Sequence, residues 1–521
     1  MNETASGASA PGAVSLRALH PHCRQRRAQR KVRQVAQRRS LIVATAAFLI
    51  GTASAGAVYG PAARDVLLRT AIGPALVLAG PAHRSPARLA LTGPQAATNE
   101  LGGGAASLRL APTQTPSPST SAVPGDGDPP AALAQAASQL DGLMITRTTS
   151  LSSGNLARWL SVVDPLDQAA RVSQTRVFTT LRALPLAPGE SWQQVGNFTF
   201  EASTSLTGSV EFRYALTGYD PAPSVTRERY SFVRRAGTWY LSGPVKVGGT
   251  LWSIPGTPTI VKRSTVLLLA WGMSSARSSQ LADDAAAAVA SVDRTVASVG
   301  LQWNRRVVVL MPPDTKVFTR DGVDPATFAG LTIAEVDPSL DYGVYATRVW
   351  LNPVSLRDEP RRAQQVLLRH EITHVATAAP APTVPGRTVP LWLAEGLADI
   401  DGYSGSGLTT HDLLTATADL LARSGRAAVP SGLPTEAQYR GSSSDTVDRA
   451  YEGGWFACHW LDLTYGGGTA ARLYAKVLAL GIAAPEQDAN ARVPAAIKAL
   501  TGLNMTQFLS RSHAALLVAA S

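Results

Sequence analysis

A continuous apolar run extends from Leu41 to Tyr59, nineteen residues without a charged side chain. A helix of this length can cross the hydrocarbon core of a bilayer. Eight Lys and Arg residues between Arg24 and Arg39 precede the run, and no acidic residue interrupts them. Basic flanks stay in the cytoplasm. The pattern therefore predicts a disordered basic cytoplasmic segment (1–40), a single transmembrane helix (41–60) and an extracytoplasmic remainder.

A cleaved signal peptide is the alternative reading of the same run. The sequence Ala53-Ser54-Ala55 has the small residues of a cleavage site, and cleavage there would make the protein secreted. Residues 61–130 follow in either case. They include three consecutive glycines and a stretch rich in Thr, Pro and Ser at 113–124, which predicts a flexible linker.

Residues 131–247 change from a helical to an alternating pattern. Helices are predicted at 131–141, 155–163 and 167–184, and strands at 193–200, 209–216, 226–233 and 238–241. In the second strand Val210, Phe212, Tyr214 and Leu216 share one face, as in a half-buried antiparallel sheet. Helices followed by a strand meander resemble the NTF2-like cone fold. We expect such an α+β domain here, with either a packing role or a ligand pocket.

A connector with Pro and Gly at 248–260 leads into a second α+β domain, predicted at 260–521. Strands are expected at 265–271, 305–311, 331–336 and 345–351, with an Ala-rich helix at 279–299. After residue 399 the pattern is helical, at 410–423, 446–465, 469–479, 494–500 and 506–518. The loops 402–407 and 427–444 are expected to rim a cleft.

Net charge and cysteine content argue against a nucleic-acid partner and against a disulfide framework. A net charge of +11 and a pI near 9.9 would ordinarily favour a nucleic-acid partner. The eight cations of residues 24–39 carry most of that charge and leave +3 for the rest, so we expect no nucleic-acid partner. Two cysteines, Cys23 and Cys458, exclude a disulfide framework, and Cys458 is expected to be buried in a helix.

Candidate chemistry is concentrated in the motif H-E-x-x-H at 370–374, within a segment, 361–378, that contains no Gly or Pro and is predicted to be helical. His370 and His374 then share one helix face and can bind one zinc ion. Glu371 can take a proton from a water on that zinc. Glu395, 21 residues after His374, can be the third ligand. Asp399, one turn further, can accept a hydrogen bond from an imidazole that binds zinc.

With W-L-x-E-G-x-A-D at 392–399, this motif resembles the gluzincin zinc metallopeptidases of the thermolysin-like clan. It is closest to the peptidase-MA-like, membrane-anchored proteins of actinobacteria, whose flanks match R-V-W-L-N-P at 348–353 and V-P-L-W-L at 389–393. The resemblance covers about residues 260–485 and implies a sheet lobe, then a helical lobe. It also implies one Zn²⁺ per chain, bound by His370, His374 and Glu395. Many thermolysin-like enzymes carry Asn where this chain has Ala394, so support for the second histidine must come from elsewhere.

The resemblance also implies that residues 348–351 form a sheet edge beside the zinc helix. That edge either binds an extended peptide by strand addition or is an ordinary edge strand.

These features predict a membrane-anchored extracytoplasmic zinc metallopeptidase that acts on a peptide or protein substrate, with Glu371 as the base. An oxyanion donor is expected among Tyr403, Tyr439, Tyr451 and His459. Tyr451 ranks first, because it resembles a tyrosine on a downstream helix of the related proteins. The alternative is a zinc-binding, non-proteolytic scaffold or sensor of the cell envelope. An intramembrane protease is excluded, because the H-E-x-x-H helix carries three arginines.

Overall fold

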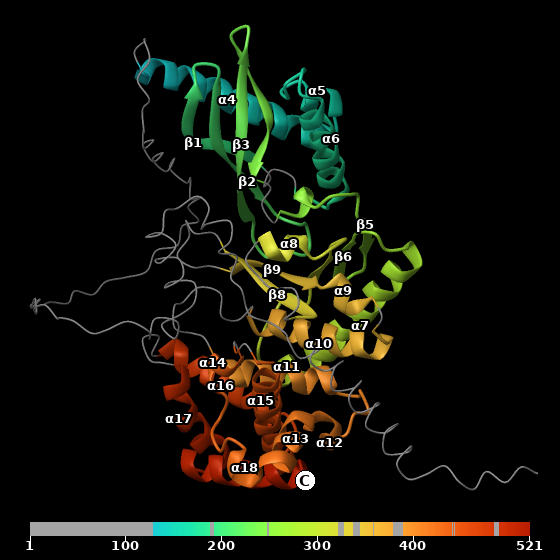
Figure 1. Ribbon diagram of the computed structural model, residues 1–521, viewed down its shortest axis with the longest axis vertical. Coiled ribbons are helices and arrows are strands. Elements are labelled where there is room, and N and C mark those ends of the chain that lie inside the picture. Colours follow the sequence, from blue (N-terminus) through green and yellow to red (C-terminus); the bar gives the residue numbers. More distant parts are fainter. Residues whose placement is uncertain are drawn as a thin grey trace, which may run out of the picture.

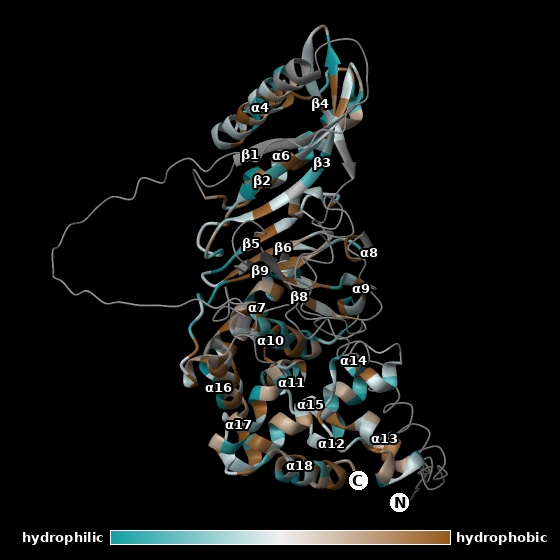
Figure 2. Ribbon diagram, turned by 90° about the vertical axis from the view of Figure 1, so that its left-hand side faces the viewer, coloured by the Kyte–Doolittle hydropathy of each residue, from teal (hydrophilic) through white to brown (hydrophobic). Residues whose placement is uncertain are grey.

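The computed structural model describes residues 129–187, 192–246, 250–320, 328–336, 344–357, 359–378, 389–439, 441, 443–483 and 489–521. Helices and two β-sheets make up these residues, so the α+β class expected from the sequence is confirmed. The elements are stacked in three tiers along the long axis of the molecule (Figure 1). We call them the meander tier, the mixed-sheet tier and the helical tier, the last of which contains the C-terminus (Figures 1 and 2).

Three helices and an antiparallel sheet form the meander tier: α4 (Pro129–Ser153), α5 (Leu156–Leu160), α6 (Gln168–Ala183), β1 (Trp192–Ala202), β2 (Ser205–Tyr214), β3 (Ser224–Arg235) and β4 (Thr238–Lys246). Its strands lie in chain order, β1-β2-β3-β4. The side chains of Asn155 and Asp167 cap α5 and α6. Ala236 and Gly237 both have positive φ, 46° and 87°, as a tight hairpin turn between β3 and β4 requires. The predicted helices and strands are therefore present, and α4 is longer than expected.

A buried polar cluster lies between the helices and the sheet of this tier. Glu228 accepts hydrogen bonds from Thr250 at 2.6 Å and from Tyr230 at 2.8 Å. The Arg147 guanidinium lies 3.7 Å from the ring centroid of Trp159. Arg147, Glu228 and Tyr230 line a small cavity, together with apolar side chains. Because Glu228 and Arg147 interact with other side chains of this tier, we interpret the cluster as a structural network.

The mixed-sheet tier has five strands: β5 (Thr259–Lys262), β6 (Val266–Ala270), β7 (Val307–Met311), β8 (Gly330–Val336) and β9 (Val344–Leu351). Their order is β5-β6-β7-β9-β8, with β6, β7 and β9 mutually parallel and the two outer strands antiparallel. Helix α7 (Ser275–Ser298) connects β6 to β7. Every residue of β6 and β7 is buried, because α7 and α10 (Arg361–Ala378) cover one face and the meander tier covers the other.

The expectation that residues 348–351 form the edge of this sheet is wrong. Strand β9 pairs with β7 on one side, where Val308 lies opposite Arg348, and with β8 on the other. The outermost strand beside the H-E-x-x-H helix is β8 instead. The cause is non-local: β8 precedes β9 in the chain, but β9 takes the place next to β7. Nothing in the local pattern of either strand encodes that order.

A bidentate ion pair joins the first two tiers. Arg348 on β9 donates to Asp220, in the segment between β2 and β3, with N–O distances of 2.5 and 2.9 Å. Both side chains are only 1% exposed. Around this pair, one apolar cluster extends from Phe212 and Tyr214 of β2 to Trp350 of β9. The meander tier and the mixed-sheet tier thus share a core.

Three further hydrogen bonds surround this ion pair. The Tyr219 hydroxyl donates to the carbonyl of Arg263 at 2.9 Å. Asn304 donates to the Tyr219 carbonyl at 3.1 Å, and Arg306 donates to the Gly218 carbonyl at 2.6 Å. Gly218 has φ +80°, and a Cβ there would lie 2.9 Å from the Arg306 guanidinium. The turn at 218–220 is therefore held by the ion pair of Asp220 and by the hydrogen bonds to the carbonyls of Gly218 and Tyr219.

The helical tier follows the H-E-x-x-H helix and consists of α11 (Leu391–Tyr403), α12 (Thr410–Leu413), α13 (Thr415–Ser424), α14 (Glu436–Tyr439), α15 (Ser444–Tyr465), α16 (Thr469–Ala483), α17 (Ala489–Thr501) and α18 (Met505–Ala519). One apolar cluster fills it, centred on α11, α15 and α16. Cys458 is fully buried in α15, as expected. The helix expected at 410–423 is divided at Leu414, whose φ of −120° is not helical.

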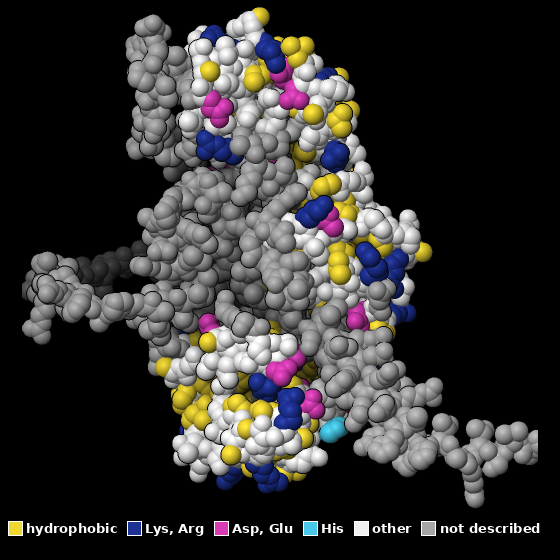
Figure 3. All heavy atoms as spheres, viewed as in Figure 1, with side chains coloured by type: hydrophobic (Ala, Val, Ile, Leu, Met, Phe, Trp, Pro, Cys, Tyr) yellow, Lys and Arg dark blue, Asp and Glu magenta, His cyan; other side chains and the backbone are white. Residues whose placement is uncertain are grey.

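The N-terminal expectations fall on residues that the structure does not describe. The basic segment, the apolar run at 41–59 and the linker before α4 all lie outside the described ranges. Among the helices that are described, none combines the length and the apolar character that a bilayer crossing requires. On the face shown in Figure 3, acidic and basic side chains of the described residues are interspersed.

The ion pair between the tiers gives a stability prediction. Asp220→Ala removes the carboxylate that faces a buried guanidinium, so the free energy of unfolding should fall by about 3–5 kcal/mol. Denaturant unfolding followed by tryptophan fluorescence measures it. The control is Asp283→Ala, which breaks an ion pair with Arg263 in which Asp283 is 58% exposed, and should leave the midpoint nearly unchanged. Equal effects of both variants would show that the junction contributes no more than a surface pair.

Candidate metal centre

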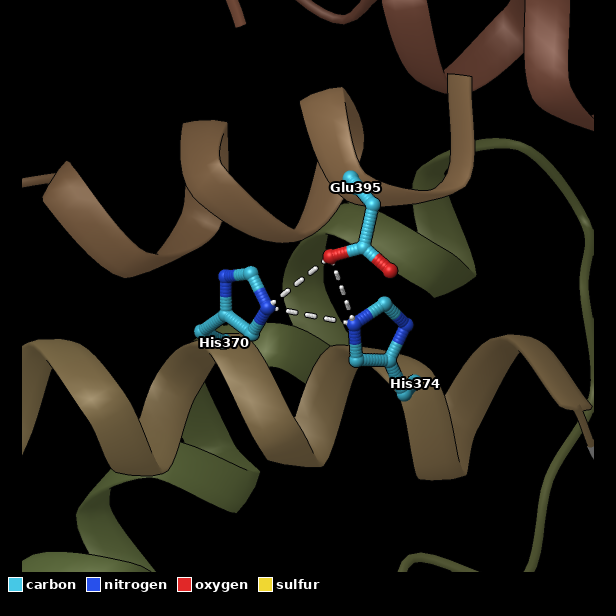
Figure 4. A group of neighbouring side chains, drawn as sticks. All are labelled: His370, His374 and Glu395. Carbon is cyan, nitrogen blue, oxygen red and sulfur yellow. Dashed lines mark hydrogen bonds and ion pairs between the residues drawn. The ribbon is translucent and has the colours of Figure 1, made fainter. Parts of the chain in front are cut away.

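Two helices bring three candidate ligands together. His370 and His374 lie one turn apart on α10, and Glu395 in the second turn of α11 points back at them (Figure 4). The two Nε2 atoms are 3.1 Å apart, and Glu395 Oε2 lies 3.3 Å from that of His370 and 3.5 Å from that of His374. All three side chains are buried. The structure therefore brings together the three ligands predicted from the sequence.

The spacing and chemistry of these atoms fit a metal ion. Ligand atoms about 2.0–2.2 Å from a tetrahedral metal lie roughly 3.3–3.6 Å from one another. Glu395 Oε2 is buried and accepts no hydrogen bond from the described residues, although it faces both imidazoles. Burial would raise the pKa of Glu395, but the two histidines outweigh it and lower that pKa. A buried anionic oxygen that lacks a donor and faces two ring nitrogens can bind a cation.

Asp399 fixes the orientation of the first histidine. Its Oδ1 lies 2.9 Å from His370 Nδ1, one helical turn beyond Glu395. With Nδ1–H donating to Asp399, the lone pair of Nε2 faces the other two ligands. Burial lowers the pKa of His370, but the neighbouring carboxylates of Asp399 and Glu395 outweigh burial and raise that pKa well above its ordinary value. The position predicted for Asp399, behind a histidine, is the one observed.

His374 has no such support among the described residues: no described side chain or carbonyl pairs with its Nδ1. Because residue 394 is Ala, we expected this support to come from elsewhere in the chain, and the described residues do not supply it.

Glu371 is buried beside the ligands and is held by the edge strand. Thr332 on β8 donates to Glu371 Oε2 at 2.8 Å. The other oxygen, Oε1, is buried and has no hydrogen-bond partner among the described residues. Burial, opposed by the charges of His370 and His374, raises the pKa of Glu371. The carboxylate thus has one oxygen with a donor and one buried oxygen without a hydrogen-bond partner among the described residues.

Interactions on the other side of the ligand helices lock α10 against α11. Arg369 donates to the carbonyl of Asp401 at 3.1 Å and to that of Gly402 at 2.7 Å, close to the C-terminus of α11. The Asp401 carboxyl group lies 3.1 Å from the Thr373 hydroxyl and accepts from Thr295 at 2.6 Å. Burial raises the pKa of Asp401 to about 6. Sequence reasoning missed these residues, because their partners lie on different elements.

The position of α11 depends on a glycine contact with α15. A Cβ on Gly396, the residue after the ligand Glu395, would lie 2.5 Å from the Gly454 carbonyl oxygen and 2.7 Å from Cys458 Sγ. A Cβ on Gly454 would in turn meet the Tyr439 hydroxyl. The two helices therefore touch backbone to backbone at the level of the metal site.

The four candidate oxyanion donors fall into two groups. The rings of Tyr439 and Tyr451 are perpendicular, 4.9 Å apart and buried. Burial, and then the charge of Glu395, raises the pKa of both hydroxyls well above its usual value, so both stay protonated donors. Tyr403 and His459 instead pack on Trp455, with ring centroids 6.3 and 4.8 Å away. The structure thus brings Tyr439 and Tyr451 close enough to Glu395 for its charge to act on both hydroxyls, and it packs Tyr403 and His459 against Trp455.

Comparison with known proteins finds no matching family model, no matching curated protein and no matching solved structure. Geometry alone therefore supports a metal centre, because the buried group of His370, His374 and Glu395 can hold one metal ion.

The contact of α11 with α15 gives the second prediction. Gly396→Ala should lower the free energy of unfolding by about 1–3 kcal/mol, because the added methyl group overlaps the Gly454 backbone. Gly142→Ala in α4 is the matched control: no atom lies within 4 Å of the added carbon. It should be neutral, or stabilising by up to about 1 kcal/mol. Both are measured by denaturant unfolding, and indistinguishable midpoints would contradict the close contact.

Proposed function

We propose that this protein is a zinc-dependent metallopeptidase of the gluzincin type, peptidase-MA-like, acting on peptide or protein substrates. The observation that carries the proposal is the position of Glu371: buried beside three ligands, with Oε1 uncommitted. Two imidazoles and one carboxylate are the ligand set of thermolysin-type zinc, which keeps a fourth position open. Bound there, zinc would polarise a peptide carbonyl and lower the pKa of a water molecule to about 7.

Different residues are proposed to bind the metal ion, to transfer the proton and to stabilise the oxyanion. His370, His374 and Glu395 would hold the ion, and Asp399 keeps His370 in the tautomer that can ligate. Glu371 Oε1 accepts the proton of the attacking water and then returns it to the leaving amine. Tyr451, as a protonated and buried phenol, is the proposed donor to the oxyanion, and Tyr439 is the alternative.

The surrounding architecture supports the same assignment. A mixed sheet precedes the H-E-x-x-H helix and a helical tier follows it, in the order of the gluzincin sheet and helical lobes. The three helices and four-stranded meander of the first tier support an NTF2-like assignment for residues 131–247. From the basic and apolar N-terminal pattern we propose an extracytoplasmic enzyme anchored to the cell membrane by residues 41–59, or secreted if that segment is a cleaved signal.

The metal assignment is tested by replacing a ligand and its supporting residue. Glu395→Ala should remove most of the bound zinc, and Asp399→Ala should weaken zinc affinity about 10- to 100-fold. Metal analysis of purified protein after dialysis measures both. Asp412→Ala, in a helix away from the site, is the control. Full zinc occupancy in Glu395→Ala would show that another residue is the third ligand.

Hydrolysis is tested through Glu371→Gln. The amide keeps the size and the contact to Thr332 but cannot take a proton, so peptide hydrolysis should fall by about 10²–10⁴ while zinc stays bound. Peptide-library digestion by zinc-loaded protein measures the activity, with Glu436→Gln as the control. A non-proteolytic scaffold would show no hydrolysis in the wild type and no effect of Glu371→Gln, whereas equal hydrolysis by wild type and Glu371→Gln would refute the role of this glutamate.

A further inference from the structure

We propose that Thr332, on the edge strand β8, is a positioning residue that sets the Glu371 carboxylate for proton transfer. This inference rests on the proposed peptidase function, which assigns Glu371 as the base. It extends that function to a residue outside the H-E-x-x-H helix and outside the ligand set.

The contact between the two residues is direct and enclosed. Thr332 Oγ1 lies 2.8 Å from Glu371 Oε2 and 3.0 Å from the backbone carbonyl oxygen of Glu371. Both side chains are fully buried. No other described residue donates to this carboxylate. A buried carboxylate with a single donor takes its orientation from that donor.

Two residues on one face of β8, Gly330 and Thr332, accommodate the Glu371 carboxylate. Gly330 and Thr332, two residues apart, point to the same side of the strand, toward α10. A Cβ on Gly330 would lie 2.8 Å from Glu371 Oε1 and 3.0 Å from Leu367 Cδ1. The glycine thus leaves room for Oε1, while the threonine holds Oε2.

The backbone of β8 is itself fixed, so the donor is in place before any substrate binds. Thr332 pairs with Val349 and Ile333 pairs with Arg348 in the register of β8 and β9. Arg348 carries the buried ion pair to Asp220. The backbone at Thr332 is therefore held by its pairing with β9 and, through Arg348, by the meander tier.

The role predicts a defined kinetic pattern. Thr332→Val is nearly isosteric and removes only the donor, so kcat should fall about 10- to 100-fold with little change in KM or zinc content. Thr332→Ser restores the hydroxyl and should recover most of the rate. Thr347→Val on the neighbouring strand is the matched control and should behave as wild type. Failure of Thr332→Ser to recover activity, or a loss of zinc in Thr332→Val, would overturn the proposal.

A second readout does not depend on activity. In metal-free protein, Thr332→Val strips the donor from a buried carboxylate and should lower the unfolding midpoint, whereas in a Glu371→Leu background, where both partners are apolar, it should cost little. Equal shifts in the two backgrounds would show that the residues are not coupled and would overturn the proposal. If the wild type cleaves no peptide but the unfolding midpoints show coupling between Thr332 and Glu371, the peptidase function is refuted and the contact between the two residues is confirmed.

Discussion

The close contact between α11 and α15 at Gly396 and Gly454 is the constraint on which the candidate metal site depends. Helix α11 lies between α10 and α15 and contributes both the candidate ligand Glu395 and Asp399, one turn further on. On one side the hydrogen bonds of Arg369 tie it to α10, and on the other the missing side chain of Gly396 lets it rest on the α15 backbone. A side chain at Gly396 would move the helix as a body and would shift Glu395 relative to both histidines.

Interactions that are local in sequence were predictable, and those that depend on strand order were not. The helical period placed His370 beside His374 and Asp399 one turn after Glu395, because i and i+4 residues share a face whatever the tertiary structure. The strands were also predicted close to their observed bounds, except β5, which begins within the segment expected to be a connector. That β9 would lie inside the sheet, with β8 at its edge, depends on pairing between distant segments. Thr332 and Gly330 were missed for the same reason.

The contrast between Arg348 and Thr332 shows where sequence patterns fail. The edge position expected for residues 348–351 was implied by the family resemblance and not by the pattern around Arg348. The arginine is in fact 1% exposed, because Asp220 of another tier supplies its counter-charge. Thr332, an ordinary strand residue in any propensity scale, owes its significance to the helix that packs over it. Strand propensity indicates only which backbone conformation a residue favours. The role of Thr332 depends on Glu371, the residue of another element that it contacts.

The ion pair of Asp220 and Arg348 also limits how the chain can be recombined. The two residues are 128 positions apart, one before and one after the connector at which a gene fusion would most naturally join two modules. A chimera that takes the meander tier from one relative and the mixed sheet from another inherits a buried charge unless both halves of the pair come with it. The two tiers therefore have to be inherited together, because either one without the other carries an unpaired buried charge.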